Sequence, residues 1–134
     1  MTVKLLNPPA HIEDRLYHHV SVASGSRYIH LAGQVSWDEH GHLVAPGDLA
    51  GQVAQVLRNV NKGFEGAGVT FADVVRITWY AADWHKDKIG AFAAGMAQAA
   101  RELDIPTFPV SLIGVSILYE PGILIEAEAT AVVP

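Results

Sequence analysis

Residues 108–133 read FPVSLIGVSILYEPGILIEAEATAVV. Two apolar runs rich in β-branched residues flank the turn signal YEPG at 119–122, which predicts two strands joined by a turn. The second run places Glu126 and Glu128 two positions apart, so both carboxylates would lie on one face of the strand. The stretch therefore predicts a strand that carries an acidic pair in an otherwise apolar segment.

Further strands are predicted upstream of this stretch. Residues 20–23 and 28–35 alternate in polarity, and the small turn residues 24–26 between them predict a β-hairpin. A polar turn is expected at 38–42. Residues 74–82 have little polar surface, which predicts a buried strand.

Two amphipathic helices are predicted between these strands. The first has a possible N-cap at Asp48 and a possible stop at Gly66 or Gly68. The second covers residues 86–103, is slim because it is rich in alanine, and ends before Pro106. Apolar residues that recur at three- and four-residue steps define the first helix: Val53, Val56, Leu57, Val60 and Phe64.

This order of elements predicts an α+β fold in which two helices cover one face of a single mixed β-sheet. Residues 112–118 and 124–133 are apolar at most positions, which predicts that the other face of the sheet is also buried. No repeat, low-complexity tract or linker is visible, so residues 1–134 are expected to form a single domain.

Composition excludes several classes of protein. Half of the 134 residues are hydrophobic, which is enough for a core, and there is no cysteine for disulfides, thiolate nucleophiles or metal ligation. Residues 1–15 lack the long apolar segment of a signal peptide, and no run is long enough to span a bilayer. A cytoplasmic location is expected. The formal charge of −5 and scattered cations disfavour a nucleic-acid surface.

Five segments together resemble the RidA/YjgF family, also known as endoribonuclease L-PSP. Residues 125–132 (IEAEATAV) are similar to the family's final strand, of the type V-E-I-E-A-x-A-V. Residues 16–20 (LYHHV) resemble its P-Y-S-x-A segment, and residues 29–35 (IHLAGQV) resemble its F-x-S-G-Q strand. Residues 59–83 resemble the helix, glycine turn and strand that follow. Together with residues 108–133, these segments extend the resemblance over nearly the whole chain.

The resemblance implies a Rid/chorismate-mutase-like fold. It also implies a homotrimer whose sheets face a central barrel, with ligand clefts at the subunit junctions. A partner subunit would then bury the second face of the sheet.

The resemblance also implies roles for individual residues. Glu126 corresponds to the family's active-site glutamate, which could orient or activate water. Tyr17 corresponds to a tyrosine that lines the cleft from the neighbouring subunit. Gly33 corresponds to a glycine whose backbone lies close to the ligand, where the absence of a Cβ is useful. Glu128 is expected to be structural.

One residue expected from the family is missing. Deaminating members grip the substrate carboxylate with an arginine whose position falls at Val110, or at Ser111 with a one-residue shift, and no arginine or lysine follows Arg101. A charge-assisted hydrogen bond contributes on the order of 1.5–3 kcal/mol. Val110 and Leu112 are therefore expected to form an apolar ligand wall, and activity toward 2-imino acids is expected to be weak.

Other catalytic sequence motifs are disfavoured. The seven histidines form no compact ligand motif such as H-E-x-x-H, so no metal site is expected, although His18 lies beside Tyr17. The glycines at 63–68 follow a helix and do not form a phosphate loop, and no serine lies in a G-x-S-x-G frame. No cofactor is expected.

Three functions remain open. The first is a deaminase or hydrolase of small reactive imines or enamines, in which Glu126 helps water attack and ammonia leave. The second is a non-catalytic or differently specific small-ligand-binding protein, which the apolar pair at Val110 and Leu112 favours. The third, RNA cleavage or inhibition of translation, is disfavoured by the acidic charge. In the first two, a small organic molecule occupies an intersubunit cleft, with no role for a membrane.

Overall fold

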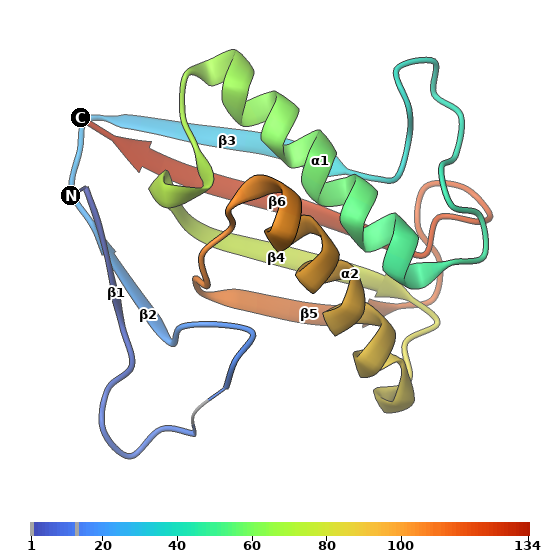
Figure 1. Cartoon of the computed structure of the whole chain (residues 1–134), viewed down its shortest axis with the longest axis horizontal. Helices are drawn as coiled ribbons and strands as arrows, with labels where there is room; N and C mark the ends of the chain where they lie inside the picture. Colours follow the sequence, from blue (N-terminus) through green and yellow to red (C-terminus); the bar gives the residue numbers. More distant parts are fainter. Residues whose placement is uncertain (1, 13) are drawn as a thin grey trace.

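A computed structural model describes residues 2–12 and 14–134 of the chain. Figure 1 shows two helices lying across one face of a twisted sheet, with the two chain ends close together. The elements are β1 (Val3–Leu6), β2 (Val20–Ala23), β3 (Arg27–Gln34), α1 (Leu49–Ala67), β4 (Val74–Ala82), α2 (Ile89–Leu103), β5 (Val110–Val115) and β6 (Ile125–Val133), with single 3₁₀ turns at Phe71–Asp73 and Lys86–Lys88.

The main sheet has four strands in the order β3-β6-β4-β5. The β4–β5 pair is parallel and the other two pairs are antiparallel, so the sheet is mixed. The parallel pair follows from α2, which crosses back over the sheet between β4 and β5 (Figure 1). The predicted α+β fold, with a mixed sheet and two helices on one face, is confirmed.

The predicted hairpin of residues 20–23 and 28–35 is wrong. β2 pairs with β1, while β3 pairs with β6. The prediction of one sheet fails with it, because β1 and β2 form a separate two-stranded ladder. β1 had not been predicted, and its pairing with β2 leaves β3 free to join the last strand of the chain.

Both helices begin and end close to the predicted positions. The Asp48 side chain accepts a hydrogen bond from the backbone N–H of Gly51 at 3.0 Å, which confirms the predicted N-cap of α1. Gly68 ends α1 with a φ of 74°, a left-handed conformation that glycine adopts without steric cost. At the α1–α2 contact, a Cβ on Gly95 would lie 2.5 Å from the carbonyl oxygen of Ala50, so the alanine-rich α2 packs close to α1.

The core lies between the helices and the main sheet. Val53, Leu57 and Val60 on α1 are fully buried, as are Ile77 and Trp79 on β4. Alternate residues of β6 complete this layer, since a strand turns successive side chains to opposite faces: Ile125, Ala127, Ala129, Ala131 and Val133.

Both helices lie on one face of the main sheet, and no helix formed by the described residues covers the opposite face (Figure 1). Arg76, Thr78 and Tyr80 alternate with the buried residues of β4 and are exposed or half-buried, so the prediction of a wholly buried strand is wrong. We call this uncovered side of the four strands the open face. Its side chains include Tyr28, His30, Arg76, Thr78, Tyr80, Ser111, Ile113, Glu126, Glu128 and Thr130.

Candidate functional site

The acidic pair of β6 lies on the open face, as its two-residue spacing predicts. Glu126 is directly opposite Tyr80 of β4, and Glu128 is opposite Thr78. Glu126 is half-buried and Glu128 is exposed. The two carboxylates therefore lie in different surroundings on one strand.

Glu126 packs against the backbone of Gly33. The β3–β6 register shifts by one residue between Leu31 and Gln34, a bulge that brings Gly33 over the Glu126 side chain. A Cβ on residue 33 would overlap the Oε1 atom of Glu126. Burial raises the pKa of Glu126, and the neighbouring charge of Glu128 raises it further. This carboxyl is therefore poised to exchange a proton at higher pH than an ordinary glutamate.

Glu128 is held by a tyrosine. The Tyr80 hydroxyl donates a hydrogen bond to the Oε1 atom of Glu128 at 2.8 Å. This bond is the main cause of a raised pKa for Tyr80, with burial adding to it. The bond fixes the direction of the Glu128 carboxylate.

The three candidate residues of β5 are divided between the two faces of the sheet. Val110 and Leu112 lie beside Ile77 and Trp79 of β4 and pack against the core on the helix side. Ser111 lies on the open face, where its Oγ atom accepts a hydrogen bond from the Arg76 guanidinium at 2.5 Å. Of the two alignments of the missing arginine, only position 111 therefore shares a face with the acidic pair.

Tyr17 lies in the segment between β1 and β2. Its ring meets the ring of His19 edge-on, with centroids 5.1 Å apart. The neighbouring His18 anchors this segment to the start of β5, with its Nδ1 atom 3.0 Å from the carbonyl oxygen of Thr107. The segment lies beyond β5 in Figure 1, on the side of the sheet away from β3, so one chain does not bring Tyr17 together with Gly33.

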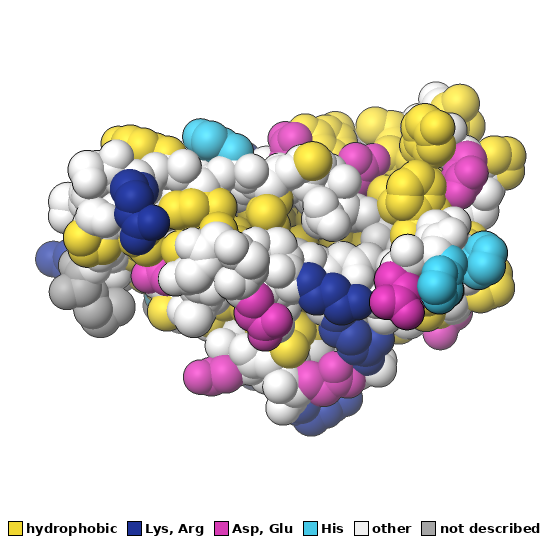
Figure 2. Space-filling model, turned by 90° about the horizontal axis from the view of Figure 1, so that it is seen from above, with side chains coloured by type: hydrophobic (Ala, Val, Ile, Leu, Met, Phe, Trp, Pro, Cys, Tyr) yellow, Lys and Arg dark blue, Asp and Glu magenta, His cyan; other side chains and the backbone are white. Residues whose placement is uncertain are grey.

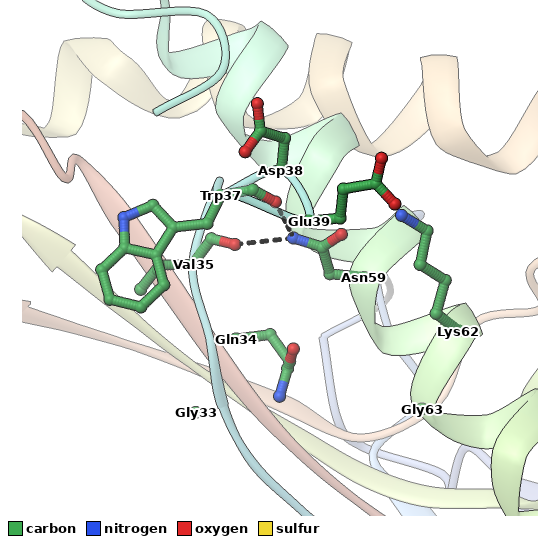
Figure 3. Close-up of a pocket in the computed structure, with 9 residues that line it drawn as sticks. All are labelled: Gly33, Gln34, Val35, Trp37, Asp38, Glu39, Asn59, Lys62 and Gly63. Carbon is green, nitrogen blue, oxygen red and sulfur yellow. Dashed lines mark hydrogen bonds between the residues drawn. The ribbon is translucent and has the colours of Figure 1, made fainter. Parts of the chain in front are cut away.

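A cavity of about 520 Å³ opens on the other side of Gly33, between the end of β3 and α1. Figure 3 shows Asn59 and Lys62 of α1 facing Gln34 and the loop after β3 across this space. The side-chain amide of Asn59 donates to the carbonyl oxygens of Val35 and Trp37, both at 2.9 Å. The sequence patterns did not single out this cavity, because its polar residues come from two elements far apart in the chain.

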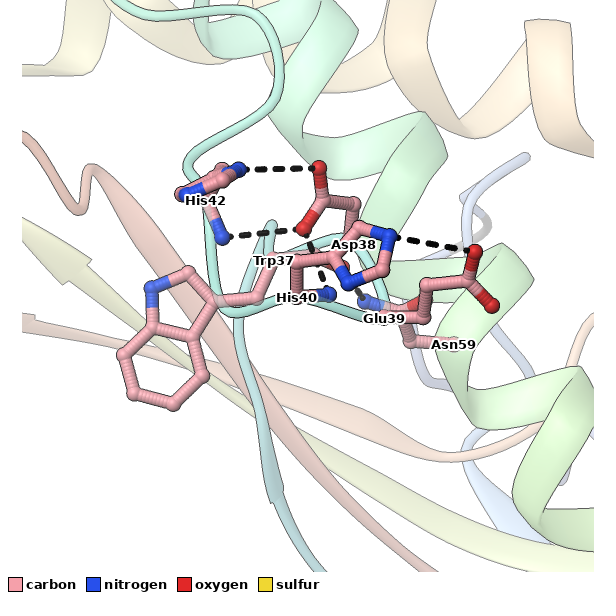
Figure 4. A network of polar contacts seen from close by, with 6 residues as sticks. All are labelled: Trp37, Asp38, Glu39, His40, His42 and Asn59. Carbon is pink, nitrogen blue, oxygen red and sulfur yellow. Dashed lines mark hydrogen bonds and ion pairs between the residues drawn. The ribbon is translucent and has the colours of Figure 1, made fainter.

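The predicted polar turn at 38–42 is present and is organised by one carboxylate (Figure 4). The Asp38 Oδ1 atom accepts from the backbone N–H groups of His40 and His42 at 2.8 and 2.9 Å. These bonds, that from His42 above all, lower the pKa of Asp38. The turn is thus stabilised by its own aspartate, and its histidines are exposed.

Two polar residues that shape this region were not among the predicted site residues. Gln52 is completely buried in α1, donates to the carbonyl oxygens of Ala45 and Gly122, and accepts from the N–H of Leu124. Gln52 thereby fixes the turn that leads into β6. Arg76 is the other; its alternation with Thr78 and Tyr80 was the available sign that β4 has a polar face.

Residues 2–12 and 14–134 also bear on metal binding and on membrane insertion. No group of three or more histidine, aspartate and glutamate side chains in this part of the chain is placed to hold a metal ion. No helix formed by these residues is both long and apolar enough to cross a membrane.

Comparison with known proteins gives the family. Residues 10–133 match the family model described as Endoribonuclease L-PSP. The crystal structure of YyfB, a Rid-family protein from Yersinia pestis, is 33% identical and superposes with a TM-score of 0.90 over 99% of this chain and 100% of that one. The YjgF gene product of E. coli is 27% identical, with a TM-score of 0.70 over 96% and 94% of the two chains.

A shorter match is found to a RutC family protein from Pyrococcus horikoshii, which is 34% identical over 56 residues. That segment is 42% of this chain and 44% of the Pyrococcus protein. The family model covers far more of the chain, and it agrees with the two structures. The chain therefore belongs to the endoribonuclease L-PSP family, the Rid/YjgF proteins.

Proposed function

We propose that this protein holds a small reactive imine or enamine on its open face and helps water to hydrolyse it. The observation that carries this proposal is the position of Glu126: a half-buried carboxyl group, packed against Gly33, whose pKa is raised by burial. A carboxyl group with a raised pKa, next to solvent, is better suited to accept and return a proton than an ordinary glutamate.

The chemistry follows from this group. Water adds to the carbon of the protonated C=N bond while Glu126 orients it and accepts one of its protons, which gives a neutral carbinolamine. Glu126 then returns this proton to nitrogen, the C–N bond breaks to release ammonia, and the hydroxyl group loses its proton to solvent as the C=O bond of the carbonyl product forms. Gly33 contributes by having no side chain, because any Cβ there would displace the carboxylate.

The ligand proposed for Glu126 carries little negative charge. The open face presents Ser111 from β5, and the adjacent Val110 and Leu112 pack toward the helices, so β5 offers no positive charge. Without a charge-assisted bond from this strand, a substrate carboxylate loses roughly tenfold to a hundredfold in binding. A substrate carboxylate would have to rely on the Arg76 guanidinium of β4, which bonds to Ser111, so neutral imines and enamines are the favoured class at Glu126.

The site is completed by assembly into a homotrimer. Large apolar side chains are exposed on the open face and at the end of β5: Tyr28 is 65% exposed, Ile113 44%, Ile117 81% and Tyr119 80%. Figure 2 shows hydrophobic side chains gathered at the end of the molecule where the loop after β5 lies. A second copy would cover these residues and bring its own Tyr17 toward the cleft.

Light scattering coupled to size-exclusion chromatography tests the assembly. A mass three times that of the chain supports the proposal, and a monomer at micromolar concentration contradicts it. Ile117→Asp should shift the mass toward the monomer, because it places a charge in the proposed contact. The matched substitution Ala94→Asp, on the exposed side of α2, should leave the mass unchanged.

Semicarbazide competition tests the chemistry. Imines are generated in place, and hydrolysis by the protein is measured as the loss of the semicarbazone that free imine would form. The wild type should hydrolyse imines that lack a carboxylate faster than 2-imino acids, and Glu126→Gln should lower the rate by about a hundredfold. Equal rates for wild type and Glu126→Gln on every imine would refute the catalytic role.

The second candidate function is binding of a small ligand without turnover. It is favoured by the absence of a positive charge at both Val110 and Ser111, the two positions where the arginine of deaminating relatives is expected. Mass spectrometry of molecules that co-purify with the protein distinguishes the two candidates, since a bound molecule that is recovered unchanged identifies a carrier. RNA cleavage remains the least favoured function, because the formal charge is −5.

A further inference from the structure

A separate cavity lies on the open face between β3, β4 and β6. Its volume is about 360 Å³, within the range of small-molecule sites. The side chains that give it chemical character are His30, Arg76, Thr78, Glu128 and Thr130. They provide one permanent positive charge, one carboxylate, two hydroxyl groups and one imidazole.

Arg76 enters this cavity without a charged partner. Its Nη2 atom donates to the neutral Ser111 Oγ at 2.5 Å, and within the part of the chain that the structure describes, Arg76 is in none of the ion pairs. The side chain is exposed. A guanidinium group has several N–H donors, so most of them remain available to a carboxylate.

Glu128 supplies the opposite charge from the neighbouring strand. One of its oxygens accepts from Tyr80, which holds the carboxylate in place, and no ion pair joins Glu128 to Arg76 among the described residues. The two groups lie on adjacent strands but bond to different neighbours, Arg76 to β5 and Glu128 to Tyr80. A fixed cation and a fixed carboxylate are thus held apart around one cavity.

We infer that this cavity binds a small zwitterion of amino-acid type, with its carboxylate on Arg76 and its ammonium group on Glu128. A ligand with only a negative charge would be attracted by Arg76 and repelled by Glu128, and a simple cation would meet the reverse. A zwitterion pairs both charges at once. The hydroxyl group of Thr78 can bond a remaining carboxylate lone pair, whereas the Thr130 Oγ1 atom already lies 3.2 Å from the Nδ1 atom of His30.

This site does not depend on the chemistry proposed at Glu126. Arg76 lies opposite Thr130, whereas Tyr80 lies opposite Glu126, so the two positions are four residues apart along β4. That spacing is about 13 Å along the strand. The cavity is lined by Glu128 and not by Glu126, so its position is distinct from that of the proposed reacting group.

A matched series of three ligands tests the inference: L-alanine, lactate and ethylamine, which carry both charges, only the carboxylate and only the ammonium group. Titrations of the wild-type protein are followed by amide chemical shifts in β3, β4 and β6. Alanine should bind at least tenfold more tightly than lactate or ethylamine, because each of these lacks one charge-assisted bond. Equal affinities for the three ligands would overturn the site. The site would also be overturned if alanine does not bind at concentrations up to 50 times that at which lactate binds.

Two variants separate the roles of the charged groups. Arg76→Gln should remove the preference for alanine over ethylamine, and Glu128→Gln should remove its preference over lactate. Glu126→Gln is the control and should leave alanine binding within about twofold. Loss of alanine binding in Glu126→Gln alone would place the ligand at the other position and refute this site, without bearing on imine hydrolysis.

The mass of each variant is measured by light scattering in the same buffers. Arg76→Gln should keep the wild-type mass and lose only the ligand preference. A change of oligomeric state that accompanies the loss of binding would assign Arg76 to a subunit contact and overturn the inference.

Discussion

The Oε1 atom of Glu126 fills the space that a Cβ on residue 33 would occupy. The contact exists because the bulge in β3 shifts its register against β6 at this point. It joins the strand that carries the candidate catalytic carboxylate to the strand at the edge of the sheet. Any residue other than glycine at position 33 must move the carboxylate.

Gly33→Ala should therefore separate stability from activity. The backbone of residue 33 has no positive φ that would strain an alanine, and the group displaced is the flexible end of a side chain. The free energy of unfolding should change by less than about 1 kcal/mol. Imine hydrolysis should fall by about tenfold to a hundredfold, since the carboxylate is misplaced.

Gly66→Ala is the matched control for this variant. Gly66 lies in α1, and a Cβ there would meet nothing within 4 Å. Alanine should stabilise the helix by up to about 1 kcal/mol and leave activity unchanged. Chemical denaturation and the semicarbazide assay report the two quantities, and unchanged activity in Gly33→Ala would show that the position of the carboxylate is not critical.

The raised pKa of Glu126 predicts the pH dependence of stability. The pKa of Glu126 is higher in the folded than in the unfolded state. The fold therefore loses stability as the pH rises from the unfolded-state pKa through the folded-state pKa. Glu126→Gln removes that cost. The variant should be more stable than the wild type at pH 7, and the difference should shrink as the pH falls below the unfolded-state pKa.

Glu102→Gln should show the opposite sign. Two hydrogen bonds of 2.9 Å from the guanidinium of Arg58 lower the pKa of Glu102, so its contribution is stabilising above the unfolded-state pKa and is lost as the pH falls through the folded one. This variant should be less stable than the wild type at pH 7 and equal to it in acid. The stability of both variants is measured by thermal unfolding between roughly pH 3 and 7, the range in which carboxyl groups titrate. Differences of the same sign would contradict this account of the two carboxyl groups.

Gln52→Leu should destabilise the fold strongly. The substitution keeps the volume but leaves the carbonyl groups of Ala45 and Gly122 and the N–H of Leu124 without their partner in a buried site. Each unsatisfied group costs about 1–3 kcal/mol, so the free energy of unfolding should fall by about 3 kcal/mol or more. Urea denaturation measures the change. The half-buried Gln98 of α2 provides the control, because Gln98→Leu should change stability by less than about 1 kcal/mol.

Features set by local sequence could be predicted. The N-cap at Asp48 and the stop at Gly68 use short-range hydrogen bonds and backbone conformation, and both are confirmed. The shared face of Glu126 and Glu128 follows from the two-residue period of a strand. The family also followed from sequence, because its motifs are spread along the chain in order.

Features that depend on pairing between distant strands could not be predicted. Residues 20–23 and 28–35 have the pattern of a hairpin, yet each strand finds its partner elsewhere: β2 pairs with β1, and β3 pairs with β6. The position of Gly33 over Glu126 depends on a bulge that no local pattern indicates. The hydrogen bond from Arg76 to Ser111 could not be predicted for the same reason, since the two residues are 35 positions apart.

The register of β5 decides where a positive charge could restore action on 2-imino acids. Ser111 is on the open face and Val110 packs against the core, so the two positions are not equivalent. The double variant Arg76→Ser, Ser111→Arg moves the guanidinium from β4 to β5 and keeps the net charge. It should raise kcat/KM for 2-imino acids, relative to neutral imines, by at least about tenfold.

Val110→Arg provides the contrast, because a guanidinium at position 110 would lie on the core side of the sheet, beside Ile77. It should lower the free energy of unfolding by about 1–3 kcal/mol and leave the preference among imines unchanged. Both variants are compared by semicarbazide competition after circular dichroism has verified the fold. A gain for Val110→Arg with none for the exchanged pair would mean that the ligand lies on the helix side of the sheet, and that the open face is not the site.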